Sequence, residues 1–213
     1  MPLFYEDDNV RLFKTSCGPY DNNSYLVVCI ETNEGLIIDA PMDPAELLAE
    51  ASGIRVQAIL ITHGHQDHLA GLQDIRAATS APVGAHVADS HSMPSALDFY
   101  VNDGDSIKFG KLALEAIYTP GHTDGSVCYL YPGHLFSGDT LFPGGPGKSK
   151  SPEKLREIII SITKKLFLLP DDIFLLPGHG KHSTLGIAKQ EYSVFDSKSH
   201  PTDLSGDVLW LES

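Results

Sequence analysis

The chain has 213 residues, of which 42% are hydrophobic, enough for a packed core and against intrinsic disorder. It carries 28 acidic and 15 basic residues, for a formal net charge of −13, so its surface would repel phosphate backbones and nucleic-acid binding is not expected. Its three cysteines, Cys17, Cys29 and Cys128, lack C-x-x-C spacing, which argues against a disulfide framework and predicts free thiols in a reducing compartment.

The first half of the chain reads as strands separated by turns and two helices. Strands are predicted over 10–17, 24–31, 36–40 and 56–62, and the turn Asn33-Glu34-Gly35 joins the second to the third. A helix is predicted over 43–52, with Asp43 as its cap and Pro44 as its first residue. Apolar residues at helical spacing predict another helix over 68–79.

The second half alternates strands with one strong helix. Strands are predicted over 81–86, over 105–120 as a pair around Gly110, over 126–131 and 134–139 as a hairpin across Pro132-Gly133, and over 172–180. The segment 141–151 is predicted to be a loop, and the clearest helix is predicted over 151–169, capped by Ser151. This order of elements predicts an α/β fold with two sheets in the middle and helices outside.

Several features concern where the protein acts. The stretch 1–14 lacks the basic start and long apolar region of a signal peptide, and no apolar run reaches the ~18 residues needed to span a bilayer. We therefore expect a cytoplasmic protein without membrane contact, with a single domain over 1–213. The tail 181–213 is predicted to hold at most one helix, and its apolar end could dock on its own chain or on a neighbour. The oligomeric state is left open.

The stretch "THGHQDHLAG" (62–71) places His63, His65, Asp67 and His68 directly after an apolar strand. Imidazole and carboxylate together suit zinc, iron or manganese. Side chains alternate along an extended segment, so the first two histidines point the same way, while the other two residues lie where the chain turns into a helix. All four would reach one ion only awkwardly, and two neighbouring metal positions are expected. A purely decorative role on the surface does not explain this spacing.

Three later motifs offer further ligands: "TPGHTDGS" with His122, "FSGDTLF" with Asp139 and "LLPGHG" with His179. Each places a polar residue beside glycine at the end of an apolar run, and glycine permits close backbone approach. Each motif alone is also typical of an ordinary turn. Following the histidine-rich stretch in this order, they reinforce the prediction of a metal site.

Together these motifs resemble the metallo-β-lactamase fold superfamily, most closely its hydroxyacylglutathione hydrolase (glyoxalase II)-like members, from about Asn23 to Gly180. The resemblance implies an αββα sandwich with the site along one edge of the two sheets. It implies two metal ions per chain, zinc first, with iron or manganese as alternatives. The implied ligands are His63, His65 and His122 for one ion, Asp67, His68 and His179 for the other, and Asp139 as the bridge between them.

The implied activity is a metal-dependent hydrolase that acts on a small molecule. A hydroxide between the ions would attack an ester, thioester, lactone or amide, with Asp67 and Asp139 as the catalytic carboxylates. Asp39 matches a strand-end aspartate of the family and is expected to orient a ligand histidine or water, a plain turn aspartate being the alternative. The remaining histidines match no ligand position and are expected to be surface or structural: His86, His91, His134, His182 and His200.

The chain departs from glyoxalase II in two places. The stretch after His179 is too short for the C-terminal helical domain that helps hold glutathione, and the loop 141–151 offers Lys148 as a basic group with no aromatic residue after it. We therefore do not expect S-lactoylglutathione to be the substrate. The loop 141–151 and the segment 88–104, with Met93, Phe99 and Tyr100, are candidates for a substrate wall, although core packing is the commoner role of such aromatics.

Other readings of the same motifs remain open. A persulfide dioxygenase-like oxidoreductase would hold a single iron through His63, His122 and Asp139. A β-lactamase or an acyl-homoserine lactonase would share all the motifs. A nuclease of the same fold is disfavoured by the acidic charge, and a purely structural metal site is disfavoured by the open position between the two ions.

Overall fold

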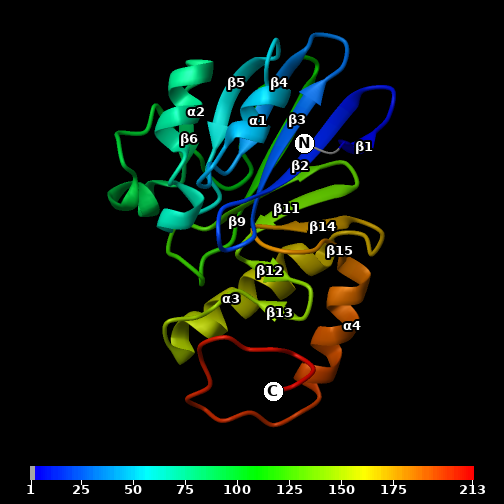
Figure 1. Ribbon diagram of the computed structural model, residues 1–213. Helices are drawn as coiled ribbons and strands as arrows, with labels where there is room; N and C mark the ends of the chain where they lie inside the picture. The colour runs from blue at the N-terminus through cyan, green and yellow to red at the C-terminus, as the bar shows by residue number, and fades with distance from the viewer. Residues whose placement is uncertain (1–2) are drawn as a thin grey trace.

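The computed structural model describes residues 3–213. Residues 1–2 lie outside it; they begin the stretch 1–14, in which we predict no signal peptide. Two mixed β-sheets pack face to face, and helices cover both outer faces (Figure 1). This is the predicted αββα sandwich. No helix within residues 3–213 is long and apolar enough to cross a bilayer.

The first sheet holds seven strands in chain order. They are β1 (Leu3–Glu6), β2 (Val10–Cys17), β3 (Asn22–Cys29), β4 (Glu34–Ile38), β5 (Arg55–Leu60), β6 (Val83–Ala85) and β7 (Phe99–Tyr100). The strands pair antiparallel from β1 to β4 and parallel from β4 to β7. Parallel neighbours need a crossover, and helices α1 (Ala45–Glu50) and α2 (Leu72–Thr79) supply the first two.

The second sheet has six strands in the order β15-β14-β11-β10-β9-β8. They are β8 (Ser106–Phe109), β9 (Leu112–Tyr118), β10 (Val127–Tyr131), β11 (His134–Gly138), β14 (Phe174–Pro177) and β15 (Ser183–Thr184). Only β11 and β14 pair parallel. Between them the chain forms a small hairpin of β12 (Leu141–Phe142) and β13 (Gly145–Pro146), then helix α3 (Pro152–Lys164); helix α4 (Leu185–Asp196) follows β15.

Three apolar clusters fill the spaces between the four layers. Strand β3 is buried along its whole length because both of its faces are covered. Its Tyr25 and Val27 belong to the cluster between the sheets, while Leu26 and Val28 belong to the cluster beneath α1 and α2. The third cluster lies between the second sheet and helices α3 and α4.

Most predicted elements are confirmed within a few residues, and the differences lie at their ends. The predicted cap of α1 is wrong: Asp43 has φ 59°, and the helix begins at Ala45 without a side-chain cap. The helix predicted over 68–79 begins at Leu72, because residues 66–68 form a separate 3-10 turn. The predicted cap of α3 is confirmed, since Ser151 Oγ accepts a hydrogen bond from the amide of Lys154, but this helix ends at residue 164 rather than 169.

The C-terminal tail docks on its own chain. Trp210 is fully buried and lies edge-on against Phe167 and Tyr192 in the third cluster. The tail carries one helix, α4, as predicted. The three cysteines are free and buried, which agrees with the prediction from their spacing.

Candidate metal centre

The candidate ligands lie where strands of both sheets end. Strands β9, β11 and β14 run in the same direction, so their carboxyl ends meet at one edge of the second sheet. The loops that follow them carry His122, Asp139 and His179. The loop after β5 of the first sheet brings the segment 63–68 to the same edge, where the amide of Val127 donates to the carbonyl of Thr62 over 2.8 Å.

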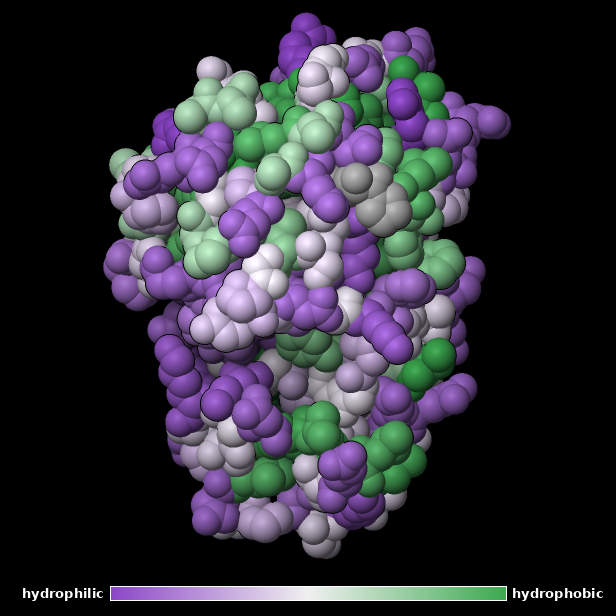
Figure 2. Space-filling view, viewed as in Figure 1, coloured by the Kyte–Doolittle hydropathy of each residue, from purple (hydrophilic) through white to green (hydrophobic). Residues whose placement is uncertain are grey.

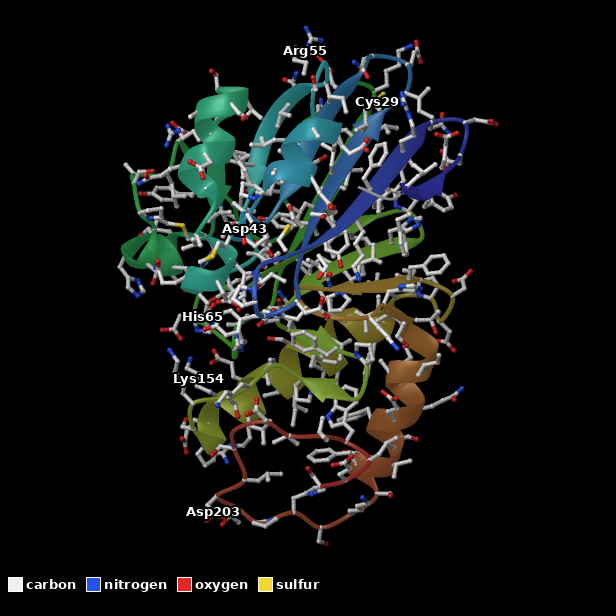
Figure 3. The ribbon with its side chains drawn as sticks, in the orientation of Figure 1. Cys29, Asp43, Arg55, His65, Lys154 and Asp203 are labelled. Carbon is white, nitrogen blue, oxygen red and sulfur yellow. The ribbon has the colours of Figure 1, made fainter. Side chains whose placement is uncertain are left out.

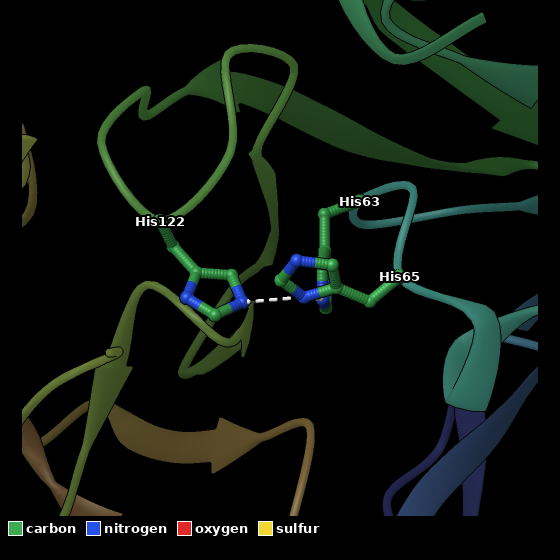
Figure 4. Close-up of side chains that lie close together, drawn as sticks. All are labelled: His63, His65 and His122. Carbon is green, nitrogen blue, oxygen red and sulfur yellow. Dashed lines mark hydrogen bonds between the residues drawn. The ribbon is translucent and has the colours of Figure 1, made fainter. Parts of the chain in front are cut away.

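The first group consists of His63, His65 and His122. Nδ1 of His65 lies 2.9 Å from Nε2 of His122 and 3.0 Å from Nε2 of His63. Figure 4 shows the three rings turned toward one another from two separate loops. Ligand atoms around a tetrahedral ion with metal–nitrogen bonds of about 2.1 Å lie about 3.4 Å apart. The spacing of these nitrogens is therefore close to that of a metal site.

The second group consists of Asp67, His68 and His179. Nε2 of His179 lies 3.1 Å from Nε2 of His68 and 3.2 Å from Oδ2 of Asp67. The distance from Nε2 of His68 to Oδ2 of Asp67 is 3.6 Å. The facing atoms of each group all lie within 4.8 Å of one another.

Asp139 lies between the two groups. Its Oδ2 is 3.5 Å from Nε2 of His122 and 3.5 Å from Nε2 of His179, and its Oδ1 is 3.4 Å from Nε2 of His68. This Oδ1 is buried and has no hydrogen-bond partner within residues 3–213. A buried carboxylate oxygen is normally satisfied, so the orphaned atom fits a cation between the two groups. Imidazoles and carboxylates in this arrangement suit a divalent metal.

Hydrogen bonds at the far side of the rings fix which nitrogen faces the centre. Three of the histidines donate from Nδ1, so Nε2 is the ring nitrogen that faces the other candidate ligands. The acceptors are Asp39 Oδ2 for His68 (2.9 Å), the carbonyl of Lys148 for His122 (2.9 Å) and the carbonyl of Tyr20 for His179 (2.8 Å).

Asp39 reaches both groups from beneath. It is buried and accepts from the amide and from the hydroxyl of Thr62, each over 2.8 Å. The same hydroxyl lies 3.1 Å from Nδ1 of His63 and accepts from it. These contacts agree with the predicted orienting role and not with that of a plain turn aspartate. The residue has φ 60°, a conformation that aspartate tolerates better than most residues.

The two groups differ in their affinity for protons. Burial lowers the pKa of both His63 and His122. Burial alone would also lower the pKa of His179, but hydrogen bonds to Asp139 and Asp67 raise it to about 10. For His68, Asp39 and Asp139 outweigh burial in the same way and raise the pKa well above its usual value.

The two carboxyls of the centre are ionised. The hydrogen bond from His179 holds the pKa of Asp67 far below its ordinary value. Burial would raise the pKa of Asp139, but the surrounding imidazoles, His63 first, hold it well below that value. At neutral pH and without metal, the first group is therefore neutral, and the second group together with Asp139 holds both protons and negative charge.

Sequence reasoning missed Asp89, which joins two loops of the centre. It is buried, and its carboxylate accepts from the amide of Gly64 (2.7 Å), the hydroxyl of Thr123 (2.7 Å) and the amide of Gly125 (2.9 Å). Asn22 was also missed; its Nδ2 donates to Oδ2 of Asp67 over 2.9 Å. No local signal marks either residue, because all of these partners are distant in the chain.

The predicted substrate wall is only partly at the centre. Met93 and Phe99 pack against the apolar clusters, and the exposed Tyr100 lines a separate pocket with Gln57 and Lys108, so core packing was the better interpretation for the first two.

Figure 2 shows a largely hydrophilic face that is hollowed between the first sheet with its helices and the region of α3 and the tail. A pocket of about 230 Å³ includes His65 and His122 among its walls.

Three proteins illustrate what this chain is similar to. A hydroxyacylglutathione hydrolase of Polaromonas sp. is 39% identical over 166 residues, which cover 75% of this chain and 62% of that protein. The mitochondrial persulfide dioxygenase ETHE1 of Homo sapiens is 33% identical over 180 residues, covering 80% of this chain and 69% of that protein. The crystal structure of TTHA1623 in a di-iron-bound form has 28% identity and a TM-score of 0.69, covering 84% of this chain and 97% of that one.

The chain thus spans less than two thirds of the length of the bacterial hydrolase it matches. Residues 17–179, which contain all seven candidate ligands, match the sequence model of the metallo-beta-lactamase superfamily. This match runs from before β3 to the loop after β14 and includes the loops at the site edge, so the chain belongs to the metallo-beta-lactamase superfamily.

Proposed function

We propose that this protein is a metal-dependent hydrolase of the glyoxalase II type, acting on an ester, thioester, lactone or amide bond of a small molecule. In this proposal the first group and the second group each hold one divalent ion, with zinc as the first choice, and Asp139 contacts both. The observation that carries the proposal is the second group: Asp67, His68 and His179 converge within 4.8 Å beside the three histidines. The similarity to a hydroxyacylglutathione hydrolase and to a di-iron structure supports it.

When bound, two such cations would polarise a carbonyl oxygen and lower the pKa of water toward neutrality. The chain's own residues then divide the remaining tasks. Asp67 is ionised and is held by Asn22 and His179, so it can accept a hydrogen bond from a water molecule and orient it. Asp39, through His68 and Thr62, keeps ring nitrogens of both groups directed inward.

A persulfide dioxygenase-like reaction is the second candidate, and the identity of 33% with the human enzyme over 80% of this chain favours it. That reaction would need one iron on His63, His122 and Asp139. It gives no role to the second group, in which Asn22 and Asp39 hold Asp67 and His68 in place. The hydrolase is therefore the preferred proposal.

Metal analysis of purified protein, combined with turnover assays, tests this choice. We expect about two metal ions per chain and hydrolysis of at least one member of a panel of thioesters, lactones and β-lactams. Asp67→Ala and His122→Ala should each abolish turnover while circular dichroism stays unchanged. His182→Ala removes an exposed histidine outside the centre and serves as the control.

Two results would refute the hydrolase. If Asp67→Ala or His122→Ala kept wild-type turnover, the roles assigned to these residues would be wrong. One iron per chain, with oxygen uptake on glutathione persulfide and no hydrolysis in the panel, would establish the second candidate instead.

A further inference from the structure

An apolar groove lies on the outer face of the second sheet. It measures about 500 Å³, and its walls come from β8, β9, the turn between β10 and β11, and the segment before β14. Side chains alternate along β9: Leu114 and Ala116 face the first sheet, so Ala113 and Glu115 point outward into the groove. Further along β9, Ile117 belongs to the cluster beneath α3 and α4, so the helices cover that part of the face and leave the groove open.

The groove is remote from the candidate ligands. Those ligands follow the carboxyl ends of β9, β11 and β14, whereas the groove is lined by residues that precede the last two of these strands, Gly133 and Ile173. The turn between β8 and β9 lies at the same end, next to Cys29, because a Cβ at Gly110 would be 2.9 Å from its Sγ. Figure 3 shows Cys29 well apart from His65. A molecule seated in the groove therefore does not reach the candidate metal centre.

Two carboxylates at the groove have no partner. Glu115 and Asp172 are exposed and line the groove, and their side chains form no hydrogen bond or ion pair within residues 3–213. Complementary surfaces bury apolar groups against one another and bring opposite charges together. The groove is therefore suited to a segment that carries an exposed apolar side chain close to a positive charge.

The chain carries such a segment directly beside the groove. The 3-10 turn Leu166–Leu168 follows α3, and its last side chain, Leu168, is 78% exposed. The next residue, Leu169, already lines the groove. Lys164, at the end of α3, is exposed, and its side chain is unpaired in the described part of the chain. Ile160, one turn earlier on α3, is 58% exposed and extends the apolar surface.

We propose that this surface binds a second copy of the same chain and forms a dimer with twofold symmetry. In the dimer each Leu168 enters the groove of the other copy, and each Lys164 faces the unpaired Glu115 there. One surface supplies both the groove with its free carboxylates and the apolar and basic residues that match them, which favours a second copy over a different protein. Because the leucine and the groove adjoin, the same contact forms twice and the assembly closes at two copies instead of growing into a filament.

Sedimentation velocity at several protein concentrations tests the proposal, and we expect a monomer–dimer equilibrium for the wild type. Leu168→Ala should raise the Kd of the dimer about 100-fold, because a central apolar contact of about ten-fold is lost twice per dimer. Leu211→Ala, at a leucine of the tail that is 53% exposed, is the matched control and should leave the Kd unchanged. Circular dichroism should show both variants folded, since both side chains are exposed.

A charge exchange identifies the surface that is used. Lys164→Glu and Glu115→Lys should each dimerise more weakly than the wild type, because like charges then meet at both contacts. An equimolar mixture of these two variants should dimerise more strongly than either alone. In the mixed pair, the unchanged Lys164 of one chain meets the unchanged Glu115 of the other, and the two substituted positions also carry opposite charges.

Three results would overturn the proposal. One is a wild type that stays monomeric up to its solubility limit. Another is a dimer with the same Kd in the wild type and in Leu168→Ala, since that dimer would form through a different surface. The third is a mixture of Lys164→Glu and Glu115→Lys that associates no more strongly than the separate variants.

Discussion

His68 donates a hydrogen bond from Nδ1 to Oδ2 of Asp39 over 2.9 Å, and both side chains are buried. Since Asp39 holds a ring of the second group directly and a ring of the first through Thr62, it governs both. We expect Asp39→Asn to weaken metal binding about 10- to 100-fold, as loss of such outer hydrogen bonds commonly does. Titration of metal-free protein with zinc measures this. Asp43→Asn is the control, because Asp43 also has positive φ but is exposed, and equal affinities in the two variants would contradict the role of Asp39.

Gly178 leaves room for Asp139, the proposed bridge between the two groups. A Cβ at this position would lie 2.3 Å from Oδ1 of Asp139 and 2.7 Å from Cε1 of His68, so Gly178→Ala should displace the carboxylate and lower the metal content. Gly133→Ala is the control, because its Cβ meets nothing within 4 Å and only its φ of 78° is unfavourable. The control should lose about 1 kcal/mol of stability and keep its metal. Full metal content in Gly178→Ala would refute this account of the bridge.

Proton release should distinguish the two groups. Metal needs neutral imidazole, and the pKa of His179 is about 10 while that of His68 is also raised. Filling the second group at pH 7.5 should therefore release about two protons, and its apparent affinity should fall as pH falls. Filling the first group should release almost none, because the pKa values of its histidines are lowered. Calorimetry in buffers of different ionisation enthalpy measures the release, and His179→Ala should reduce it.

The raised pKa of His179 also predicts how the stability of the metal-free protein depends on pH. A pKa raised from 6.5 to about 10 on folding stabilises the folded chain. This contribution is complete below pH 6.5 and is lost as pH rises toward 10. Urea unfolding of metal-free wild type and His179→Ala at several pH values measures it. A difference that grows as pH rises would contradict the assignment.

We expect Asp89 to stabilise the folded chain and to support metal binding at the first group. Asp89→Ala leaves two buried amides, of Gly64 and Gly125, without their acceptor and should cost about 3 kcal/mol, since each unsatisfied group costs about 1–3 kcal/mol. Because Gly64 lies between His63 and His65, metal at the first group should be lost before metal at the second. Asp89→Asn keeps an acceptor oxygen, so its stability should lie between that of Asp89→Ala and that of the wild type. Thermal unfolding and metal analysis give the two readouts, and a stable Asp89→Ala with full metal content would refute the role.

The local sequence patterns predicted the fold well wherever a long helix or strand is flanked by turn residues. The missed strands are short, with four residues in β1 and two each in β7, β12, β13 and β15, and no periodicity can develop over such lengths. Strands β12 and β13 form a hairpin within the segment 141–151, which was predicted to be a loop. The cap at Asp43 was mispredicted because the residue type does not reveal that the backbone is left-handed there.

At the site, residue type and resemblance predicted which seven side chains to consider, and the structure brings them together. Their role as metal ligands remains a prediction. The supporting residues were out of reach, because Asp89 and Asn22 act on partners far along the chain. The ion pair between Lys148 and Asp207 was equally out of reach, since it depends on where the tail comes to lie.

The tail also has a consequence for ligand binding at a distance. Ser149 and Gly206 exchange two backbone hydrogen bonds of 3.0 Å, next to the Lys148 carbonyl that holds His122. We therefore expect docking of the tail and metal binding at the first group to favour each other, and by reciprocity to the same extent. Loading the centre should slow amide hydrogen exchange at Gly206 and Trp210, and undocking the tail should weaken loading by the same factor.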